Sequence, residues 1–385
     1  MVVELVSRPA TTPSGLSRYA DTLARYLQME DIPFHRRPTE MPGYLRPLAR
    51  VGKIAGYDLP TFFENYPVGG QFSGNALYHL TSESLASLLV FQSLKPSVVT
   101  VHGFFSYLLR NVPELRVYQH IFHQWFDKLV VWGLSRADHL ICVSHYLKNV
   151  LVEQMGIPPA KVTVIYEAVD HESFYPAPVA DSFYARFGLS HDHRYVLYVG
   201  SEQPRKNFLT LLRAFARLRQ RMPDLYLLKV GQAEYEQERQ KALQLIDELG
   251  LRESVLFMGH VSGELPDFYR LADAFVFPSL YEGFGFPPLE AMACGTPVVS
   301  SNTSSLPEVV GDAALLFNPL DEEELLAALA RLLCDEALQQ EYRRRGLENA
   351  RRFQWEAVAQ QTVEVYRHVF EGETVSLDAR GGKGG

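Results

Sequence analysis

The stretch "FVFPSLYEGFGFPPLEAMACGTPVVSS", residues 275–301, predicts a buried strand, a glycine–aromatic loop and a helix. The helix pattern "PPLEAMAC" has prolines at its start and Gly295 just past its end, the usual placement of these residues at helix termini. Glu282 and Glu290 lie on either side of the loop. A packed core does not require two carboxylates at such positions, so we expect this loop to contact a polar ligand.

The same alternation of apolar runs and helical patterns continues in both directions from this stretch. It includes the runs "VVELV", "ALYHL", "SVVTVH", "HLICVS", "YVLYVG", "LYLLKVG" and "SVLFMG". Strands that alternate with helices indicate parallel, doubly wound sheets of the α/β class. The alternation breaks at about 170–194, so we expect a linker there and two Rossmann-like domains, residues 1–175 and 176–355. A helix is expected at 356–371, followed by a disordered tail, residues 372–385.

Composition narrows the range of functions. The net charge of −8 over 385 residues argues against general nucleic-acid binding. No apolar run approaches the roughly 18 residues that span a bilayer, and the N-terminus lacks a signal-peptide pattern. Cys142, Cys294 and Cys334 have neither metal-ligand nor redox spacing. These features favour a cytoplasmic protein.

The positive charge is concentrated in one segment of the first half. Residues 35–53 contain a single acid and five basic residues, namely Arg36, Arg37, Arg46, Arg50 and Lys53. The segment fits a solvated loop or helix face, or a contact with an anionic acceptor or membrane surface at the inner membrane face. Trp125 and Trp132 are seven residues apart, which predicts helical core packing.

A second glycine-containing segment, "YVLYVGSEQPRKNF", supplies cations at the end of a predicted strand. Gly200 follows the strand, and Arg205 and Lys206 precede a helix. A planar guanidinium beside a compact ammonium suits a diphosphate. Gly283 and Gly285 allow the backbone to approach a ligand closely. Glu290 is better suited to neutral hydroxyls than to phosphate.

These motifs resemble the retaining glycosyltransferases of family 4, which have the GT-B fold. The matching segments are "PSLYEGFGFPPLEAMACGTPVVSSNTSSLPEVVGDAALLFNP", "GSEQPRKN", "ADHLICVSHYLKNVL", "VIYEAVDHESFYP", "TPSGLSRYADTLARYL" and "VVTVHGFF". The resemblance covers most of the chain, but neither residues 35–75 nor the tail. It implies two Rossmann-like domains facing a cleft, with the C-terminal helix packed back on the N-terminal domain.

The resemblance also implies roles for individual residues. The implied catalytic residues are His102, Glu282, Arg205 and Lys206. The implied donor-binding residues are Gly15, Gly200, Arg205, Lys206, Val261, Glu282, Gly283, Phe284, Gly285 and Glu290. Among them, Arg205 and Lys206 bind the diphosphate, Glu290 the ribose and Glu282 the sugar. Val261 lies near the base, and His102 near the sugar from the facing domain.

Two departures from the family pattern affect this assignment. Ser201 stands where many relatives have a second arginine, which leaves part of the phosphate clamp open. "YEAVD" replaces the commoner Asn-Gly-Val-Asp, so a binding role for Glu167 is also open. No Asp-x-Asp metal motif is present, and neither a metal nor a cofactor is expected.

The expected reaction is transfer of a hexose from a nucleoside-diphosphate sugar, UDP ahead of GDP-mannose, to a saccharide or lipid-linked acceptor. Retention fits either front-face attack or a carboxylate nucleophile. A nucleotide-sugar 2-epimerase and an inactive nucleotide-sugar-binding subunit are the alternatives. The glycine–aromatic loop favours a transferase over an epimerase, and the intact charged residues argue against an inactive subunit.

Overall fold

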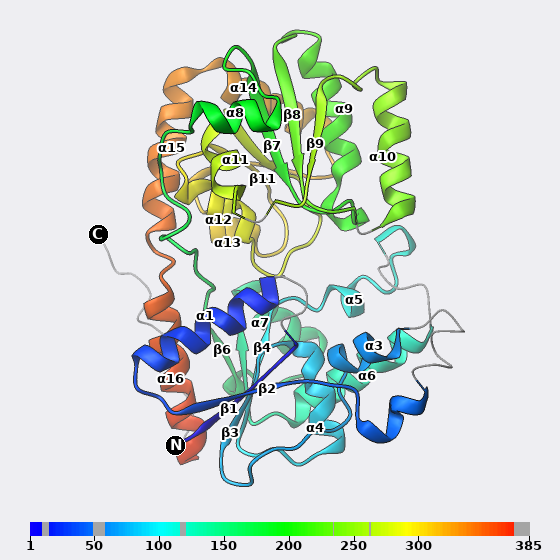
Figure 1. Ribbon diagram of the computed structural model, residues 1–385, viewed down its shortest axis with the longest axis vertical. Helices are drawn as coiled ribbons and strands as arrows, with labels where there is room; N and C mark the ends of the chain where they lie inside the picture. Colours follow the sequence, from blue (N-terminus) through cyan, green and yellow to red (C-terminus); the bar gives the residue numbers. More distant parts are fainter. Residues whose placement is uncertain (10–14, 49–57, 116–120, 234, 262, 373–385) are drawn as a thin grey trace. The chain divides into compact units, whose positions relative to one another are not determined.

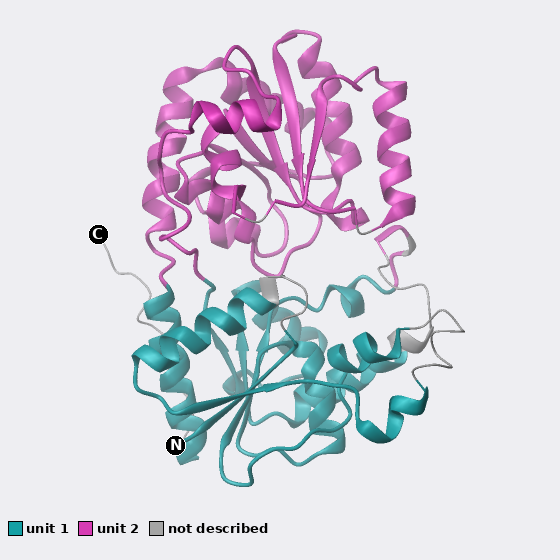
Figure 2. Ribbon diagram, viewed as in Figure 1, with its two compact units in different colours: residues 1–110, 118–167, 355–385 teal, residues 111–117, 168–354 magenta. Residues whose placement is uncertain are grey.

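The computed structural model describes residues 1–9, 15–48, 58–115, 121–233, 235–261 and 263–372. The chain divides into two compact units (Figure 2). Unit 1 comprises residues 1–110, 118–167 and 355–385, and unit 2 comprises 111–117 and 168–354. The chain therefore enters unit 2 briefly at 111–117, builds most of it from residue 168 onward, and returns to unit 1 for its last helix.

Unit 1 is built on a six-stranded parallel sheet of order β2-β1-β3-β4-β5-β6 (Figure 1). The strands are β1 (Val3–Ser7), β2 (Phe34–Pro38), β3 (Leu77–Leu80), β4 (Ser97–Val101), β5 (His139–Cys142) and β6 (Val162–Val164). The helices include α1 (Gly15–Met29), α3 (Leu59–Asn65), α4 (Leu88–Phe91), α5 (Phe105–Leu108), α6 (Ile121–Arg136), α7 (His145–Asn149) and α16 (Trp355–Glu371). The central strands are buried throughout, as expected of parallel strands covered on both faces.

The C-terminal helix α16 packs within unit 1, against α1 and β4. The Tyr366 hydroxyl forms a 2.5 Å hydrogen bond with Nδ1 of His79 on β3, and the Tyr26 hydroxyl donates to Glu356. His79 Nε2 pairs with the Thr100 hydroxyl at 2.7 Å. These contacts confirm the predicted return of the last helix to the N-terminal fold.

Unit 2 repeats the design with the strand order β12-β11-β10-β7-β8-β9. The strands are β7 (Arg194–Val199), β8 (Leu225–Val230), β9 (Val255–Gly259), β10 (Ala274–Phe277), β11 (Val298–Ser301) and β12 (Ala314–Phe317). The helices include α8 (Asp181–Phe187), α9 (Phe208–Arg219), α10 (Glu236–Glu248), α11 (Leu265–Leu271), α12 (Phe286–Ala293), α13 (Leu306–Val310), α14 (Glu322–Cys334) and α15 (Glu336–Ala350). The core is formed by apolar side chains of β7, β8, α9 and α14.

Residues 168–175, assigned to the N-terminal domain from sequence, cluster with unit 2 in the structure. The reason is a set of contacts with α11. Arg270 donates to the carbonyls of Ser173 and Tyr175, and the Phe174 ring packs on Tyr269. The tail beyond residue 372 lies outside the described residues, so its predicted disorder stays a prediction.

Candidate active site

The predicted donor-binding residues of unit 2 lie around the carboxyl ends of its strands. Gly200 directly follows β7, and the loop with Gly283 and Gly285 joins β10 to α12. Val261 follows β9 and is half-buried. Ligands of open parallel sheets bind beyond these strand ends. The structure thus brings the predicted segments to the edge of the sheet where a ligand would bind.

Three of the predicted charged residues form one buried cluster. The Glu282 carboxylate accepts from Lys206 Nζ at 2.7 Å and lies 3.0 Å from Arg205 NH1. The three side chains are only 10–12% exposed. Burial raises the pKa of Glu282, but Lys206 and Arg205 outweigh it and hold that pKa at about 2. Glu282 is therefore a permanent anion whose two oxygens each have a cationic partner.

Local backbone structure aims both cations at this carboxylate. Arg205 and Lys206 lie on a single 3₁₀ turn, and Asn207 after it adopts a left-handed conformation (φ 56°) that starts α9. Arg205 also donates to the Tyr281 carbonyl, and Lys206 Nζ lies 4.9 Å from the centroid of the Phe277 ring. We call Arg205, Lys206 and Glu282 the clamp. The 3₁₀ turn, β10 and the loop that follows β10 hold its side chains in place.

The glycine–aromatic loop is fixed by hydroxyls from the segment after β11. Ser305 Oγ is within hydrogen-bond distance of the carbonyls of Glu282 and Phe284, and the Glu282 amide donates to Ser304 Oγ. Gly285 has φ 137°, and a Cβ there would meet Leu306 at 2.9 Å. The backbone at the start of α12 therefore requires glycine for conformation as well as for space.

Glu290 lies apart from this cluster, within α12. It is 3% exposed, and its carboxylate accepts a 2.9 Å hydrogen bond from the hydroxyl of Tyr269 on α11. The resemblance assigned Glu290 to a ribose without predicting this partner. The bond fixes the side chain in place, and the ribose role stays a prediction.

In unit 1, His102 directly follows β4 and is held by two acceptors. Its Nε2 donates to the Thr81 carbonyl at 2.8 Å, and its Nδ1 lies 2.7 Å from the Glu167 carboxylate. A carbonyl and an ionised carboxylate can only accept hydrogen bonds. Both ring nitrogens of His102 must therefore be protonated when both hydrogen bonds form. Burial lowers the pKa of His102, but Glu167 and Glu83 raise it more, and the net shift is upward. The site favours an imidazolium ion.

Glu167 is the residue whose role the sequence left open. It is 2% exposed and 65 positions from His102 along the chain. The sequence signal was the departure "YEAVD" from the family pattern, which pointed to the position but not to its partner. The structure makes Glu167 the counter-ion of His102.

The predicted basic segment, 35–53, is a solvated loop or helix only in part, since residues 43–48 form an exposed helical turn. Its first part is the edge strand β2, and its described arginines are paired. Arg36 forms an ion pair with Asp21 at 2.6 Å, and Arg37 forms one with the buried Glu4 at 2.5 Å. Arg46 forms an ion pair with Glu40 at 3.1 Å. Arg50 and Lys53 lie outside the described residues. These pairs leave less free positive charge than the sequence suggested.

Two further expectations concern helices of unit 1. Trp125 and Trp132 on α6 are 55% and 52% exposed, so the prediction that they pack in the core is wrong. The core face of α6 is formed instead by Phe126, Val130 and Leu134. Gly15 begins α1, and the loop before it, residues 10–14, lies outside the described residues. The implied donor-binding role of Gly15 stays a prediction.

Among the described residues, no group of three or more His, Cys, Asp or Glu side chains could hold a metal ion. None of the described helices combines the length and apolarity that crossing a membrane requires.

Comparison with family models gives two matches. Residues 181–353 match the model described as glycosyl transferases group 1, and residues 74–173 match the model of glycosyltransferase family 4. Together the two matched regions span nearly all of unit 2 and less than half of unit 1, and they include every predicted site residue except Gly15.

The curated relatives of this chain include glycosyltransferases. The O-antigen chain mannosyltransferase B of Escherichia coli is 34% identical over 255 residues, 63% of this chain and 64% of the relative. The serotype-specific mannosyltransferase WbdA of Escherichia coli is 32% identical over 246 residues, 62% of this chain and 29% of the relative. The matched region thus spans less than two thirds of either relative's length.

Among solved structures, sucrose-phosphate synthase from Thermosynechococcus elongatus superposes with a TM-score of 0.75 at 25% identity. The match covers 97% of this chain and 100% of that one. Two six-stranded parallel sheets with flanking helices, together with this match, identify the GT-B fold.

Proposed function

Because the chain belongs to glycosyltransferase family 4, we propose that it transfers a hexose from a nucleoside-diphosphate sugar to a hydroxyl of a saccharide acceptor. The observation that carries this proposal is the clamp of Arg205 and Lys206 on Glu282, beside the glycine–aromatic loop and at the carboxyl edge of the unit 2 sheet. The mannosyltransferase activity named for the two relatives favours mannose as the transferred sugar.

On the donor side, the proposed role of the clamp is electrostatic. Cleavage of the sugar–phosphate bond leaves negative charge on the departing diphosphate, and prearranged cations stabilise such charge most effectively in a buried site. Arg205 and Lys206 are already oriented by Glu282, so little reorganisation would accompany binding. The amides at the start of α12 would add donors for phosphate or sugar oxygens.

The pairing of Glu282 bears on how the configuration is retained. A carboxylate nucleophile needs an oxygen free to attack, whereas each Glu282 oxygen has a cationic partner. Its pKa of about 2 also makes it a weak base. These features support front-face attack, in which the departing phosphate takes the acceptor proton. We propose that no metal takes part.

On the acceptor side, His102 is proposed to contribute positive charge, because Glu167 favours its protonated form. The acceptor is proposed to be a saccharide, free or lipid-linked, handled in the cytoplasm. A peripheral contact with an anionic membrane stays a secondary proposal, and the ion pairs of Arg36, Arg37 and Arg46 weaken its basis.

The first test is a thermal-shift screen against UDP, GDP, dTDP and ADP, followed by incubation of the matching nucleotide hexose with and without a saccharide acceptor in EDTA. We expect stabilisation by UDP or GDP, and sugar transfer only with acceptor. The sequence placed UDP first because "SGELP" has few side chains that could read guanine, whereas a preference for GDP would fit the mannosyltransferase relatives.

The same experiment separates the alternatives. Isomerisation of the donor sugar without acceptor would indicate the epimerase, and nucleotide binding with neither transfer nor isomerisation would indicate an inactive nucleotide-sugar-binding subunit. Loss of transfer in EDTA that magnesium restores would contradict the metal-independent mechanism.

A further inference from the structure

A network of buried polar side chains connects the C-terminal helix with the surroundings of His102. It consists of Tyr366 on α16, His79 on β3, Thr100 on β4 and Tyr19 on α1, none of them more than 2% exposed. His79 Nδ1 lies 2.5 Å from the Tyr366 hydroxyl, and its Nε2 lies 2.7 Å from Thr100 Oγ1. Thr100 Oγ1 lies 3.1 Å from the Tyr19 hydroxyl. We call these four residues the α16 network.

The last member of the network packs directly on His102. The centroids of the Tyr19 and His102 rings lie 4.6 Å apart, with the ring planes at 77°, an edge-to-face arrangement. Trp355, the first residue of α16, also contacts Tyr19, with the ring centroids 5.9 Å apart, and α16 packs on α1 (Figure 1). The C-terminal helix therefore supports the Tyr19 ring in two ways, by hydrogen bonding through the network and by ring packing.

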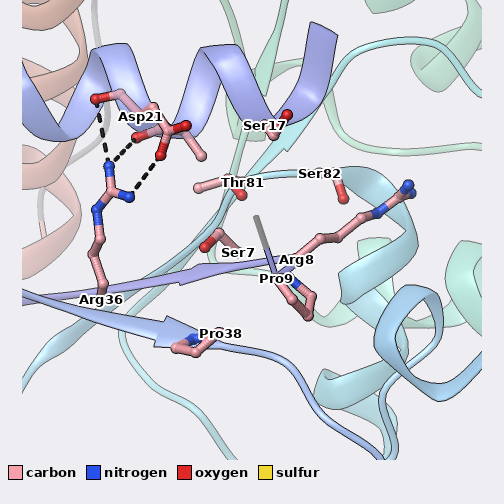
Figure 3. A pocket seen from close by; sticks show the side chains of 10 residues that line it. Ser7, Arg8, Pro9, Ser17, Asp21, Arg36, Pro38, Thr81 and Ser82 are labelled. Carbon is pink, nitrogen blue, oxygen red and sulfur yellow. Dashed lines mark hydrogen bonds and ion pairs between the residues drawn. The ribbon is translucent and has the colours of Figure 1, made fainter. Parts of the chain in front are cut away.

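The backbone that carries Tyr19 is held by β2. Figure 3 shows Arg36, on β2, bonded to Asp21 of α1. The same guanidinium donates to the carbonyls of Ala20 and Asp21. Helix α1 is thus attached to the sheet within two residues of Tyr19. The side chain of Tyr19 remains to be fixed, and the α16 network fixes it at the hydroxyl.

The hydrogen bonds of the network depend on one another because His79 is neutral. Its burial and the nearby His102 hold its pKa at about 3. A neutral imidazole carries one N–H group and one lone pair, so it donates to one of its two hydroxyl partners and accepts from the other. Without the Tyr366 hydroxyl, one ring nitrogen of His79 would be buried with no partner, which is unfavourable. The other members would then have to rearrange, and Tyr19 is the member that contacts His102.

We infer that Tyr366 is a positioning residue for His102, which it reaches through the α16 network and the Tyr19 ring. The network keeps the His102 ring in the orientation in which its Nδ1 bonds Glu167. The inference goes beyond the proposed function, since it concerns the state of His102 in the protein without substrate. The titratable groups that interact with His102 are Glu167, Glu83, His79 and Tyr19.

The test is NMR titration of the His102 ring protons in the full chain, with Tyr366→Phe compared with wild type. We expect the pKa of His102 to fall by about half a unit, or roughly threefold in its protonation equilibrium, because its bond with Glu167 is held less firmly. Tyr19→Phe cuts the network at its other end and should give a similar shift. The double variant should shift no further than either single one, because both substitutions break the same network.

Thr362→Val is the matched control. Thr362 is buried on the same helix, and its hydroxyl donates to the Val358 carbonyl, outside the network. This variant should lose stability without a change in the pKa of His102. In rate measurements, Tyr366→Phe should lower kcat about threefold above neutral pH and leave the donor KM unchanged, whereas Thr362→Val should change neither.

Three outcomes would overturn the inference. They are an unchanged or raised pKa of His102 in either Tyr366→Phe or Tyr19→Phe, an equal shift in Thr362→Val, and shifts that add in the double variant. If Tyr366→Phe does not fold, Tyr19→Phe alone carries the comparison with Thr362→Val. The titration needs no sugar donor, so it is independent of the proposed function. The expected shifts in a protein that transfers no sugar would count against the proposed function only.

Discussion

Each unit holds a buried glutamate against positive charge near the carboxyl edge of its sheet, but the cations differ in kind. In unit 2, Glu282 is paired with Arg205 and Lys206, which stay charged throughout the physiological range. In unit 1, Glu167 is paired with His102, which can lose its proton. The same geometry thus gives a fixed electrostatic clamp in one unit and a titratable pair in the other.

This difference predicts which unit makes the activity depend on pH. Glu282, with a pKa of about 2, leaves its ionised state only in strong acid. His102 has a raised pKa, so its charge changes above its ordinary value of 6.5. We therefore expect activity changes near neutral pH to originate in unit 1, while affinity for the diphosphate is set by unit 2.

The largest effect is expected from Lys206→Ala, which breaks the fixed clamp. Loss of a charge-assisted bond to a buried carboxylate or phosphate costs roughly 1.5–3 kcal/mol, so nucleotide affinity and kcat/KM should each fall by about 10- to 100-fold. Calorimetry and initial rates measure both. Lys241→Ala, at an exposed pair of unit 2, is the matched control and should change neither. Unaltered nucleotide affinity in Lys206→Ala would remove Lys206 from the donor site.

The next effect in size is expected from Glu167→Gln, which removes the counter-ion of His102. The pKa of His102 should fall, and the alkaline limb of the rate profile should move to lower pH, with roughly tenfold lower kcat. NMR titration of the histidine ring protons measures this pKa. Glu153→Gln, at an exposed position of the same unit, should leave the profile unchanged.

The same pair should contribute to stability with a definite sign. Because the folded-state pKa of His102 is raised, its contribution is fully present below the unfolded value and is lost as pH rises through the folded value. Urea unfolding should therefore separate wild type from Glu167→Gln most clearly in mild acid. A gap that widens with rising pH would contradict the imidazolium assignment.

A smaller effect is expected from His79, the neutral counterpart of His102. Burial and the nearby His102 hold its pKa at about 3. Below about pH 6.5 the unfolded chain binds a proton at this histidine that the folded chain does not bind. The free energy of unfolding therefore decreases as the pH is lowered through this range. Ring-proton NMR should show no titration of His79 down to pH 5, where the fold persists. Titration of His79 above pH 5 would place it outside the core.

The smallest effect is expected from Tyr269→Phe, which deletes a neutral donor to Glu290 and leaves both charged clusters intact. One hydrogen bond contributes about 1 kcal/mol, so stability should fall by that amount and nucleotide affinity by a few-fold at most. Thermal unfolding and calorimetry measure the two. A loss of affinity as large as that of Lys206→Ala would mean that Tyr269 itself contacts the nucleotide.

Much of the fold was predictable because buried parallel strands are continuous apolar runs. The runs at "AFVF" and "HLIC" are strands β10 and β5, and the helix expected over "PPLEAMAC" is α12. Strand β2 was missed because "FHRRP" has no such run. It pairs only with β1 at the edge of the sheet, where exposed charges are tolerated and discourage further pairing.

The candidate site was predictable where its residues are close in sequence. The glycine–aromatic loop and the 3₁₀ turn were both identified, because backbone conformation and charge are encoded locally. The pairing of His102 with Glu167 depends on how β4, β5 and β6 lie side by side, which no local pattern specifies. The exposure of Trp125 and Trp132 was missed because helical spacing tells which residues share a face, not what covers that face.

The return of α16 to unit 1 has a consequence for how the protein is made. The strands and helices of unit 2 between residues 181 and 350 are contiguous, so they can fold while synthesis is still under way. The His79–Tyr366 bond cannot form until residue 366 has left the ribosome. The part of the chain synthesised first is therefore completed last, and a nascent chain stopped before Trp355 would leave the α16-facing side of β3 and β4 open to chaperones and proteases.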